Sequence, residues 1–148
     1  MANEAIIKVG TPKTLEANGA SIANNALDQA NDASYAVVAD GASYPHAEFV
    51  LTCAFTTAPT EGTTIILLAR PLNVDGTADT EVPETTRGTY FVGAFVVNNV
   101  GSSTSQTMVL YARDVPREAD YYIYNNGTGQ SINAGWVLKV TPRSVGPA

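Results

Sequence analysis

Cysteine and histidine are almost missing from this chain, which has one of each, Cys53 and His46. A single cysteine cannot form an internal disulfide or build a cluster of several thiolates around a metal. Cys53 lies in the alternating run AEFVLTCAF, so we expect a small buried side chain. His46 follows Pro45 in an expected surface loop, and an extended chain separates it from Cys53 by roughly 20 Å. That separation argues against a Cys–His nucleophile pair.

Long hydrophobic runs are missing as well. The N-terminal stretch MANEAIIKVG has an acid at Glu4 and only Ile6 and Ile7 before Lys8. It therefore lacks the apolar region of about 7–15 residues that a secretory signal peptide requires. No run approaches the roughly 18 apolar residues of a membrane span. We expect a protein made in a cytoplasm, with no membrane partner.

Charge is sparse and mostly of one sign. Only 15% of the residues are charged, against about 25% in an average globular domain. Eight Lys and Arg face 14 Asp and Glu, a net charge of −6, so the field of the protein repels phosphate backbones. Nucleic acid is not an expected partner. The length of 148 residues and the apolar share of 45% indicate one globular domain.

The sequence does contain several alternating runs typical of β-strands. The run EFVLTCAF (48–55) places four apolar side chains on one face at a period of two residues: Phe49, Leu51, Cys53 and Phe55. The run TTIILLARPL (63–72) follows after TAPTEG, which contains Pro and Gly. This pattern predicts a hairpin between the two strands.

Three further strands are expected in the second half of the chain. The run TYFVGAFVV (89–97) is apolar on both faces, which favours a central strand, and TMVLYARDV begins the next strand at Thr107. In the last strand Trp136, Leu138 and Val140 share one face. The polar segment 73–88 is expected to be a long cross-connection, which favours a Greek-key or jelly-roll sandwich over a meander.

The first 46 residues are harder to assign. Asn18–Gly19 is a two-residue hairpin signal, and the Ala-rich run 22–30 is compatible with a short helix. We expect short strands around 15–17 and 35–39, with the first dozen residues extended. The whole pattern predicts an all-β, single-domain antiparallel β-sandwich, a jelly roll, with an extended N-terminal arm at 1–12 and the sandwich domain at 13–148.

Residues with catalytic or metal-binding chemistry do not form a recognisable motif. Four acids lie within ten residues, but their spacing does not match a calcium-binding loop, and we interpret them as a solvated connection: Asp75, Asp79, Glu81 and Glu84. The chain has no G-x-S-x-G nucleophile elbow, and GTGQS (127–131) lacks the lysine of a phosphate-binding loop. We therefore assign no catalytic residue, no metal ligand and no cofactor.

Aromatic side chains leave one alternative open. Sugar rings stack on exposed aromatic faces, and the region 121–136 offers four such residues: Tyr121, Tyr122, Tyr124 and Trp136. Alternation places Tyr122 and Tyr124 on the opposite face from Tyr121, so part of this set must belong to the core. The alternative is a carbohydrate-binding jelly-roll module.

Three stretches carry a resemblance to a known class of proteins. TPKTLEANGASIANNALDQANDASY, AEFVLTCAFTTAPTEGTTIILLARPL and ADYYIYNNGTGQSINAGWVLKVTPRSV resemble small virion structural proteins of tailed bacteriophages, in particular capsid decoration or cement proteins. The resemblance runs over nearly the whole chain and consists of turns and strands, not of a catalytic signature. It implies a non-enzymatic β-sandwich that sits as a dimer or trimer on the outer capsid surface. With this resemblance, the carbohydrate-binding alternative becomes a jelly-roll module of a phage tail or receptor-binding protein.

The resemblance also implies a partner and a surface. The partner is the major capsid protein, whose neighbouring subunits the protein clamps on the virion. We expect the contact in the N-terminal arm, at four apolar residues: Ile6, Ile7, Val9 and Leu15. An arm that orders on docking loses entropy at that moment, so its binding depends on a preassembled lattice. The loop NNGTGQS is then interpreted as a hairpin loop at one end of the sandwich.

Overall fold

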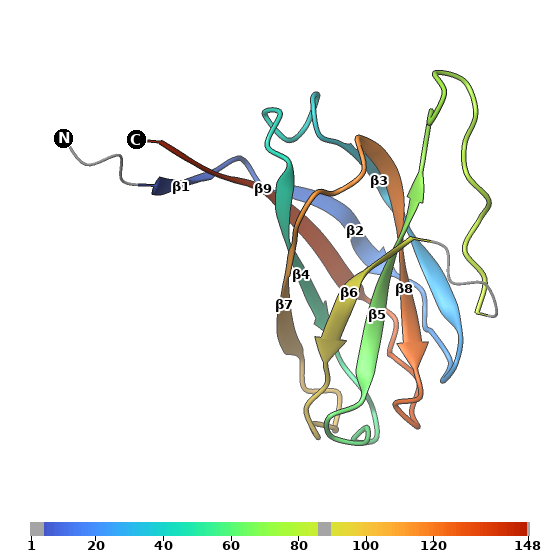
Figure 1. Cartoon of the computed structure of the whole chain (residues 1–148). Helices are drawn as coiled ribbons and strands as arrows, with labels where there is room; N and C mark the ends of the chain where they lie inside the picture. Colours follow the sequence, from blue (N-terminus) through green and yellow to red (C-terminus); the bar gives the residue numbers. More distant parts are fainter. Residues whose placement is uncertain (1–4, 86–89, 148) are drawn as a thin grey trace.

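The computed structural model describes residues 5–85 and 90–147 and shows two antiparallel β-sheets packed face to face (Figure 1). Over these residues the chain forms nine strands and no helix: β1 (Ala5–Val9), β2 (Lys13–Gly19), β3 (Leu27–Ala36), β4 (His46–Cys53), β5 (Thr64–Pro71), β6 (Phe91–Val96), β7 (Gln106–Ala112), β8 (Glu118–Asn126) and β9 (Trp136–Pro147). The predicted all-β sandwich is confirmed.

The strand pairing is that of a jelly roll. One sheet has the order β1-β9-β4-β7, with β2 also paired to β9, and the other has the order β3-β8-β5-β6. The pairs β2–β9, β3–β8, β4–β7 and β5–β6 are nested, as if one long antiparallel hairpin had been rolled up. Successive strand pairs along the rolled hairpin alternate between the two facing sheets, which is the topology of a jelly roll.

The core lies between the sheets and is filled by the alternating side chains. The four apolar residues predicted on one face of the 48–55 run are 0–3% exposed, and Trp136, Leu138 and Val140 are equally buried. The centroids of the Phe49 and Tyr121 rings lie 4.8 Å apart across the two sheets. Alternation therefore identified the core faces of β4 and β9 correctly.

Two predicted hairpins are wrong. Strands β4 and β5 do not pair, because β4 lies between β7 and β9 while β5 lies between β6 and β8 in the other sheet. The segment 54–63 carries the chain across the sandwich. The loop NNGTGQS does the same between β8 and β9. A turn-rich segment permits either a reversal within one sheet or a crossing between two, and its composition does not distinguish them.

The segment 89–97 does not form a central strand. Strand β6 lies at the edge of its sheet, and Phe91 and Val96 are 62% and 60% exposed. The segment 73–88 is likewise no cross-connection, because β5 and β6 are neighbours in one sheet; it is a long excursion between hydrogen-bonded partners, with 86–89 outside the described residues. The jelly roll was thus predicted correctly, but the cross-connection at 73–88 on which that prediction was based does not exist.

The N-terminal region contains neither the hairpin predicted at Asn18–Gly19 nor the short helix compatible with the Ala-rich run. Asn18 and Gly19 lie inside β2 and make no hairpin, and the Ala-rich run leads into β3 without a helix. A Cβ atom on Gly19 would overlap the indole of Trp136, whose Nε1 donates a 2.8 Å hydrogen bond to the Ala20 carbonyl. Glycine is needed there because a ring lies against the backbone.

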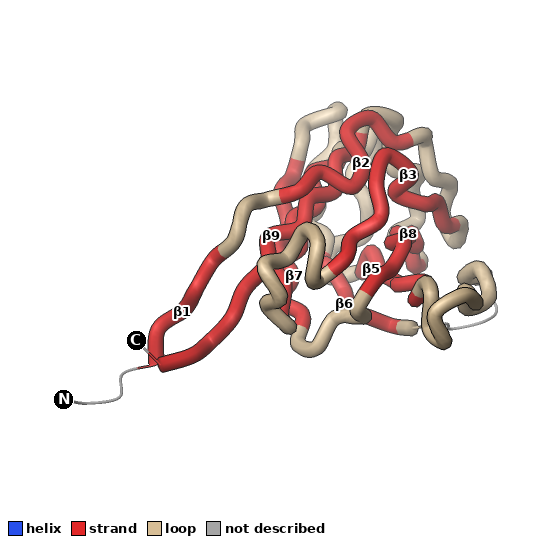
Figure 2. The backbone as a smooth tube through the Cα atoms, turned by 90° about the horizontal axis from the view of Figure 1, so that it is seen from above, coloured by secondary structure: helices blue, strands red, loops and turns tan. Residues whose placement is uncertain are grey.

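A two-stranded ribbon projects from the sandwich. It consists of β1 and its partner residues Arg143–Pro147 of β9, in the register Ile7↔Val145 and Val9↔Arg143. Seen from above, the ribbon extends away from the body of the molecule (Figure 2). The division of the chain into an arm 1–12 and a domain 13–148 stays a prediction, and the structure adds that 5–9 are a paired strand.

Candidate docking surface

The outer face of the β1-β9-β4-β7 sheet has exposed apolar side chains. Tyr111 lies opposite Glu48, and Val109 lies opposite Val50, with all four pointing away from the core. Across the sheet Arg143 is opposite both His46 of β4 and Val9 of β1, so the ribbon continues the same face. We call the following residues, 48–64% exposed, the docking patch: Ile7, Val9, Val109, Tyr111 and Val145.

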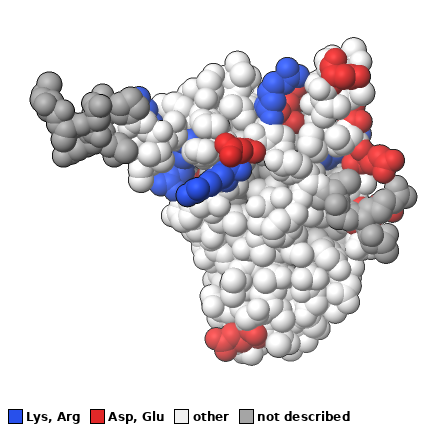
Figure 3. Space-filling model, in the orientation of Figure 1, with Lys and Arg blue, Asp and Glu red and all other residues white. Residues whose placement is uncertain are grey.

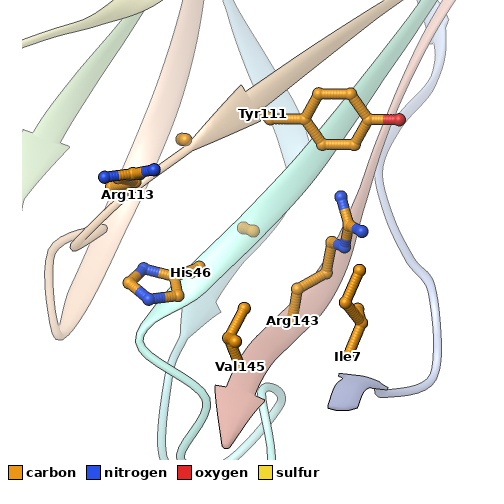
Figure 4. Close-up of a pocket in the computed structure, with 8 residues that line it drawn as sticks. Ile7, His46, Tyr111, Arg113, Arg143 and Val145 are labelled. Carbon is orange, nitrogen blue, oxygen red and sulfur yellow. The ribbon is translucent and has the colours of Figure 1, made fainter. Parts of the chain in front are cut away.

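A shallow groove of about 150 Å³ lies inside this patch, between the ribbon and β7. Figure 4 shows Ile7 and Val145 on one side of it, with Tyr111 and His46 around the rim. Arg143 lies between them, 4.7 Å from the centre of the Tyr111 ring and 3.6 Å from Glu48 Oε2. The lining of the groove is mostly apolar, and its Arg143 is already engaged by Glu48 and the Tyr111 ring, so the groove suits an apolar side chain of a protein partner better than a small anion.

The outer face of the other sheet is partly covered, and its most exposed apolar side chains, Phe91 and Val96, stand on the edge strand β6. Leu68 and Tyr122 are paired across β5 and β8 and point away from the core, yet they are only 5% and 4% exposed. Beside them Arg70 donates a hydrogen bond to the Thr80 carbonyl, so the β5–β6 excursion lies over this face. Exposed apolar patches mark interaction sites in soluble proteins. The open face is therefore the stronger candidate.

The predicted contact residues divide between two environments. Ile6, Ile7 and Val9 are 40%, 60% and 60% exposed on the ribbon, where they are available to a partner. Leu15 is fully buried in the core and cannot contact a partner surface without unfolding β2. We leave Leu15 out of the candidate surface. Val109, Tyr111 and Val145 were missed, because their grouping depends on a register that the sequence does not show.

The aromatic platform of the carbohydrate alternative is buried. Tyr121, Tyr122 and Trp136 are at most 4% exposed, and only Tyr124 is partly accessible. Tyr121 and Trp136 belong to the core cluster, and the Tyr122 hydroxyl donates to Gln29 Oε1. The proposed stacking face is therefore wrong. The exposed aromatic residues lie elsewhere: Tyr90, Phe91 and Tyr111.

The loop NNGTGQS uses its polar groups to hold its own end of the sandwich together. The Nδ2 group of Asn125, fully buried, donates to the carbonyls of Ile22, Ala23 and Gln130. Its Oδ1 accepts a 2.6 Å hydrogen bond from Thr128 Oγ1. Four connecting segments meet at this end with one charged residue among them, Glu61: 20–26, 54–63, 97–105 and 127–135. In Figure 3 the charges accordingly gather toward the opposite end.

The remaining candidate residues have structural explanations. Burial raises the pKa of the Cys53 thiol to about 12, so Cys53 is an unreactive core residue, as predicted. His46 begins β4, and its Nδ1 accepts a hydrogen bond from the Asp114 N–H, which ties the β7–β8 connection to that strand. His46 and Cys53 lie on opposite faces of β4.

The acidic excursion shows no metal-binding arrangement in its described part. The Asp75 carboxylate accepts the N–H groups of Ala78 and Thr77, which hold its pKa below the ordinary value, and Asp79 lies 3.7 Å from Arg70. Within 5–85 and 90–147 no group of three His, Cys, Asp or Glu side chains could hold a metal ion. The same residues contain no helix long and apolar enough to cross a membrane.

Comparison with known proteins gives little further information. No protein-family model matches the chain. No curated protein matches it either. Among solved structures, a chain of Desmodium yellow mottle tymovirus is similar over 100% of this chain and 91% of its own length, with 17% identity and a TM-score of 0.34. So loose a superposition carries no argument about fold or function.

Proposed function

We propose that this protein is a non-enzymatic structural component of a virion. Specifically, it is a decoration or cement protein on the outer head surface of a tailed bacteriophage, made in the bacterial cytoplasm, that bridges neighbouring major capsid subunits. The single observation that carries the proposal is the docking patch, an open apolar sheet face extended by a projecting ribbon. A protein that works by adhesion needs such a surface.

Two further properties support this proposal. Jelly rolls occur in viral capsid domains and in lectins, and this support is an analogy at the level of fold. The net charge of −6 repels packaged nucleic acid, which favours the outer side of a shell over the inner side. Of the two jelly-roll classes, the lectin alternative lacks the aromatic platform on which it was based.

The geometry of the patch explains how bridging would work. Ile7, Val9 and Val145 belong to the ribbon, which extends beyond the sandwich in Figure 2, while Val109 and Tyr111 belong to β7 of the sandwich itself. One copy therefore offers two connected apolar areas to a surface larger than itself. Linked weak contacts gain affinity through effective concentration once the first contact has formed.

The proposal is tested on particles that lack the protein. Purified protein is added to such shells, and bound copies are counted by quantitative gel analysis and electron microscopy. We expect Tyr111→Ser and Ile7→Ser to lower occupancy at least tenfold at a concentration where the wild type is half saturated. Val96→Ser removes an equally exposed apolar side chain from the other sheet and serves as the matched control.

Three outcomes would contradict the proposal. One is a normal occupancy of the two patch variants, and another is a deletion of residues 1–12 that leaves occupancy unchanged. The third is a location of the wild type at a single vertex in a few copies, which would indicate a tail component. Copies in the hundreds, spread over the shell, are the expected result.

A further inference from the structure

Strand β1 has an edge with no strand beside it. Within the sandwich the sheet edges approach one another, with β2 packing beside β3 and β6 beside β7. Strand β1 is the last strand in its sheet order, and no second strand of the described chain pairs with it. A two-stranded ribbon is marginally stable in water, and an unpaired apolar edge is a template for another strand.

The backbone groups on this edge can be identified. The Gly10 N–H donates to the Pro142 carbonyl at 2.8 Å, so position 10 is hydrogen-bonded to β9. In an antiparallel pair such positions alternate, which directs the N–H and C=O groups of Lys8 and Ile6 toward β9 as well. The corresponding groups of Ile7 and Val9 therefore point to the unpaired edge.

We propose that this edge binds the β1 edge of a second copy of the same chain. The two strands pair antiparallel about a two-fold axis that is perpendicular to the sheet and passes midway between Ile7 of one copy and Ile7 of the partner subunit. The two Ile7 residues then exchange both of their N–H···O=C bonds, and the backbone of each Val9 does the same with Ala5 of the partner subunit. The result is one sheet that continues through both molecules.

The side chains and charges favour a second copy as the occupant. In this register Lys8 lies opposite Ile6 of the partner subunit, so the two ammonium groups are not directly opposed. Ile7 lies opposite the partner's Ile7, which covers side chains that are 60% exposed in one copy. Each copy has a net charge of −6, and a junction at the tips of projecting ribbons keeps the two acidic bodies apart.

The dimer explains how the protein bridges two capsid subunits, and this explanation rests on the proposed function. A two-fold axis perpendicular to the sheet leaves both docking patches on the same side of the pair. Two patches that face one way can bind two neighbouring capsid subunits at once, and the second contact forms at high effective concentration. The pairing itself does not require a shell and is measurable in the isolated protein.

The test is the mass of the purified protein by sedimentation velocity, with the secondary structure followed by circular dichroism. We expect a concentration-dependent dimer for the wild type. Ile7→Pro removes one edge N–H and no bond to β9, so it should raise the dimer dissociation constant at least tenfold. Ile7→Ala keeps the N–H and is the control for the lost side chain, with a smaller increase expected. A wild type that stays monomeric, or a trimer, would overturn the inference.

A cross-linking experiment tests the register without relying on proline. Cys53 is buried, so a Cys53→Ala background leaves any introduced cysteine as the single reactive thiol. Ile7→Cys should form an intermolecular disulfide on mild oxidation, because paired Cα atoms about 5.5 Å apart fall within disulfide geometry. Ile6→Cys and Lys8→Cys should not. Efficient cross-linking through either of these two, or none through Ile7→Cys, would overturn the proposed axis.

The two proposals fail separately. If the protein is monomeric but its patch variants lose shell occupancy, the dimer is wrong and the proposed function stands. If the dimer forms through β1 but shells do not bind it, the proposed function is wrong and the dimer stands.

Discussion

The guanidinium carbon of Arg143 lies 4.7 Å from the centre of the Tyr111 ring. The two residues come from β9 and β7, which are separated by β4, and Arg143 reaches over that strand while Nη1 stays 3.6 Å from Glu48 Oε2. A cation above an aromatic face is attracted by the ring quadrupole. This contact keeps Tyr111 beside the groove and joins the ribbon side of the sheet to its far edge.

This contact should be measurable as a coupling energy. We expect a double-mutant cycle of Arg143→Ala and Tyr111→Ala to give about 0.5–1 kcal/mol in urea unfolding, the usual range for a partly exposed cation–π pair. The control cycle pairs Arg143→Ala with Val109→Ala, the next residue on the same face of β7, and should give no coupling. Equal coupling in both cycles would show that the contact is not specific.

Gly19 should be intolerant of a methyl group. A Cβ atom there would overlap the Trp136 indole, so Gly19→Ala forces the ring or β2 to move and should lower the free energy of unfolding by about 1–3 kcal/mol. Gly146→Ala, also in a strand but with nothing within 4 Å of the added atom, should stay within about 0.5 kcal/mol of wild type. Urea denaturation of both variants decides the question, and an equal effect would refute the packing argument.

Cys53 should make the fold sensitive to alkaline pH. Burial raises the pKa of its thiol from 9.0 to about 12, so between these values the unfolded chain has lost a proton that the folded chain keeps. Stability is therefore fully present below pH 9 and falls above it, by about 1.4 kcal/mol per pH unit from this group. Unfolding curves from pH 8 to 11 should show a shallower decline for Cys53→Ala. An identical decline in both proteins would contradict the assignment.

Asn125 should be essential to the uncharged end of the sandwich. Its buried amide donates to carbonyls of two other segments and accepts from Thr128, so Asn125→Leu leaves these groups without partners. We expect a loss of about 2–4 kcal/mol, the combined cost of several unsatisfied buried groups. Asn126→Leu, with one hydrogen bond to Thr64 at a less buried position, should lose about 1 kcal/mol or less. Thermal unfolding followed by circular dichroism separates the two outcomes.

Alternation along the sequence predicted which side chains enter the core but not which strands are neighbours. The inward faces of β4 and β9 followed from a period of two residues, since burial on one face needs nothing else. Pairing was mispredicted for β4 and β5 because segment 54–63 has turn chemistry that serves a reversal and a crossing equally well. Gly19 was read as a turn residue although its role depends on Trp136, far along the chain.

Only part of the docking patch could be predicted, because the sequence does not show the register between strands. Ile6, Ile7 and Val9 stand out in the sequence because they are apolar residues next to a terminus. Val109 and Tyr111 belong to a run that is apolar on both faces, and such a run indicates either a central strand or an exposed adhesive one. For the same reason β6 was predicted to be a central strand, whereas it lies at the edge of its sheet. These residues share one face of the sheet because β9 pairs with both β1 and β4, and β4 pairs with β7.

Because the first and last strands pair with each other, the ribbon tip is where affinity tags or displayed antigens would emerge if they were fused to either terminus. Such cargo would crowd the β1 edge. The turn at Glu61–Gly62, between β4 and β5 at the opposite end, keeps inserted peptides away from that edge and is the better attachment point for decorating particles.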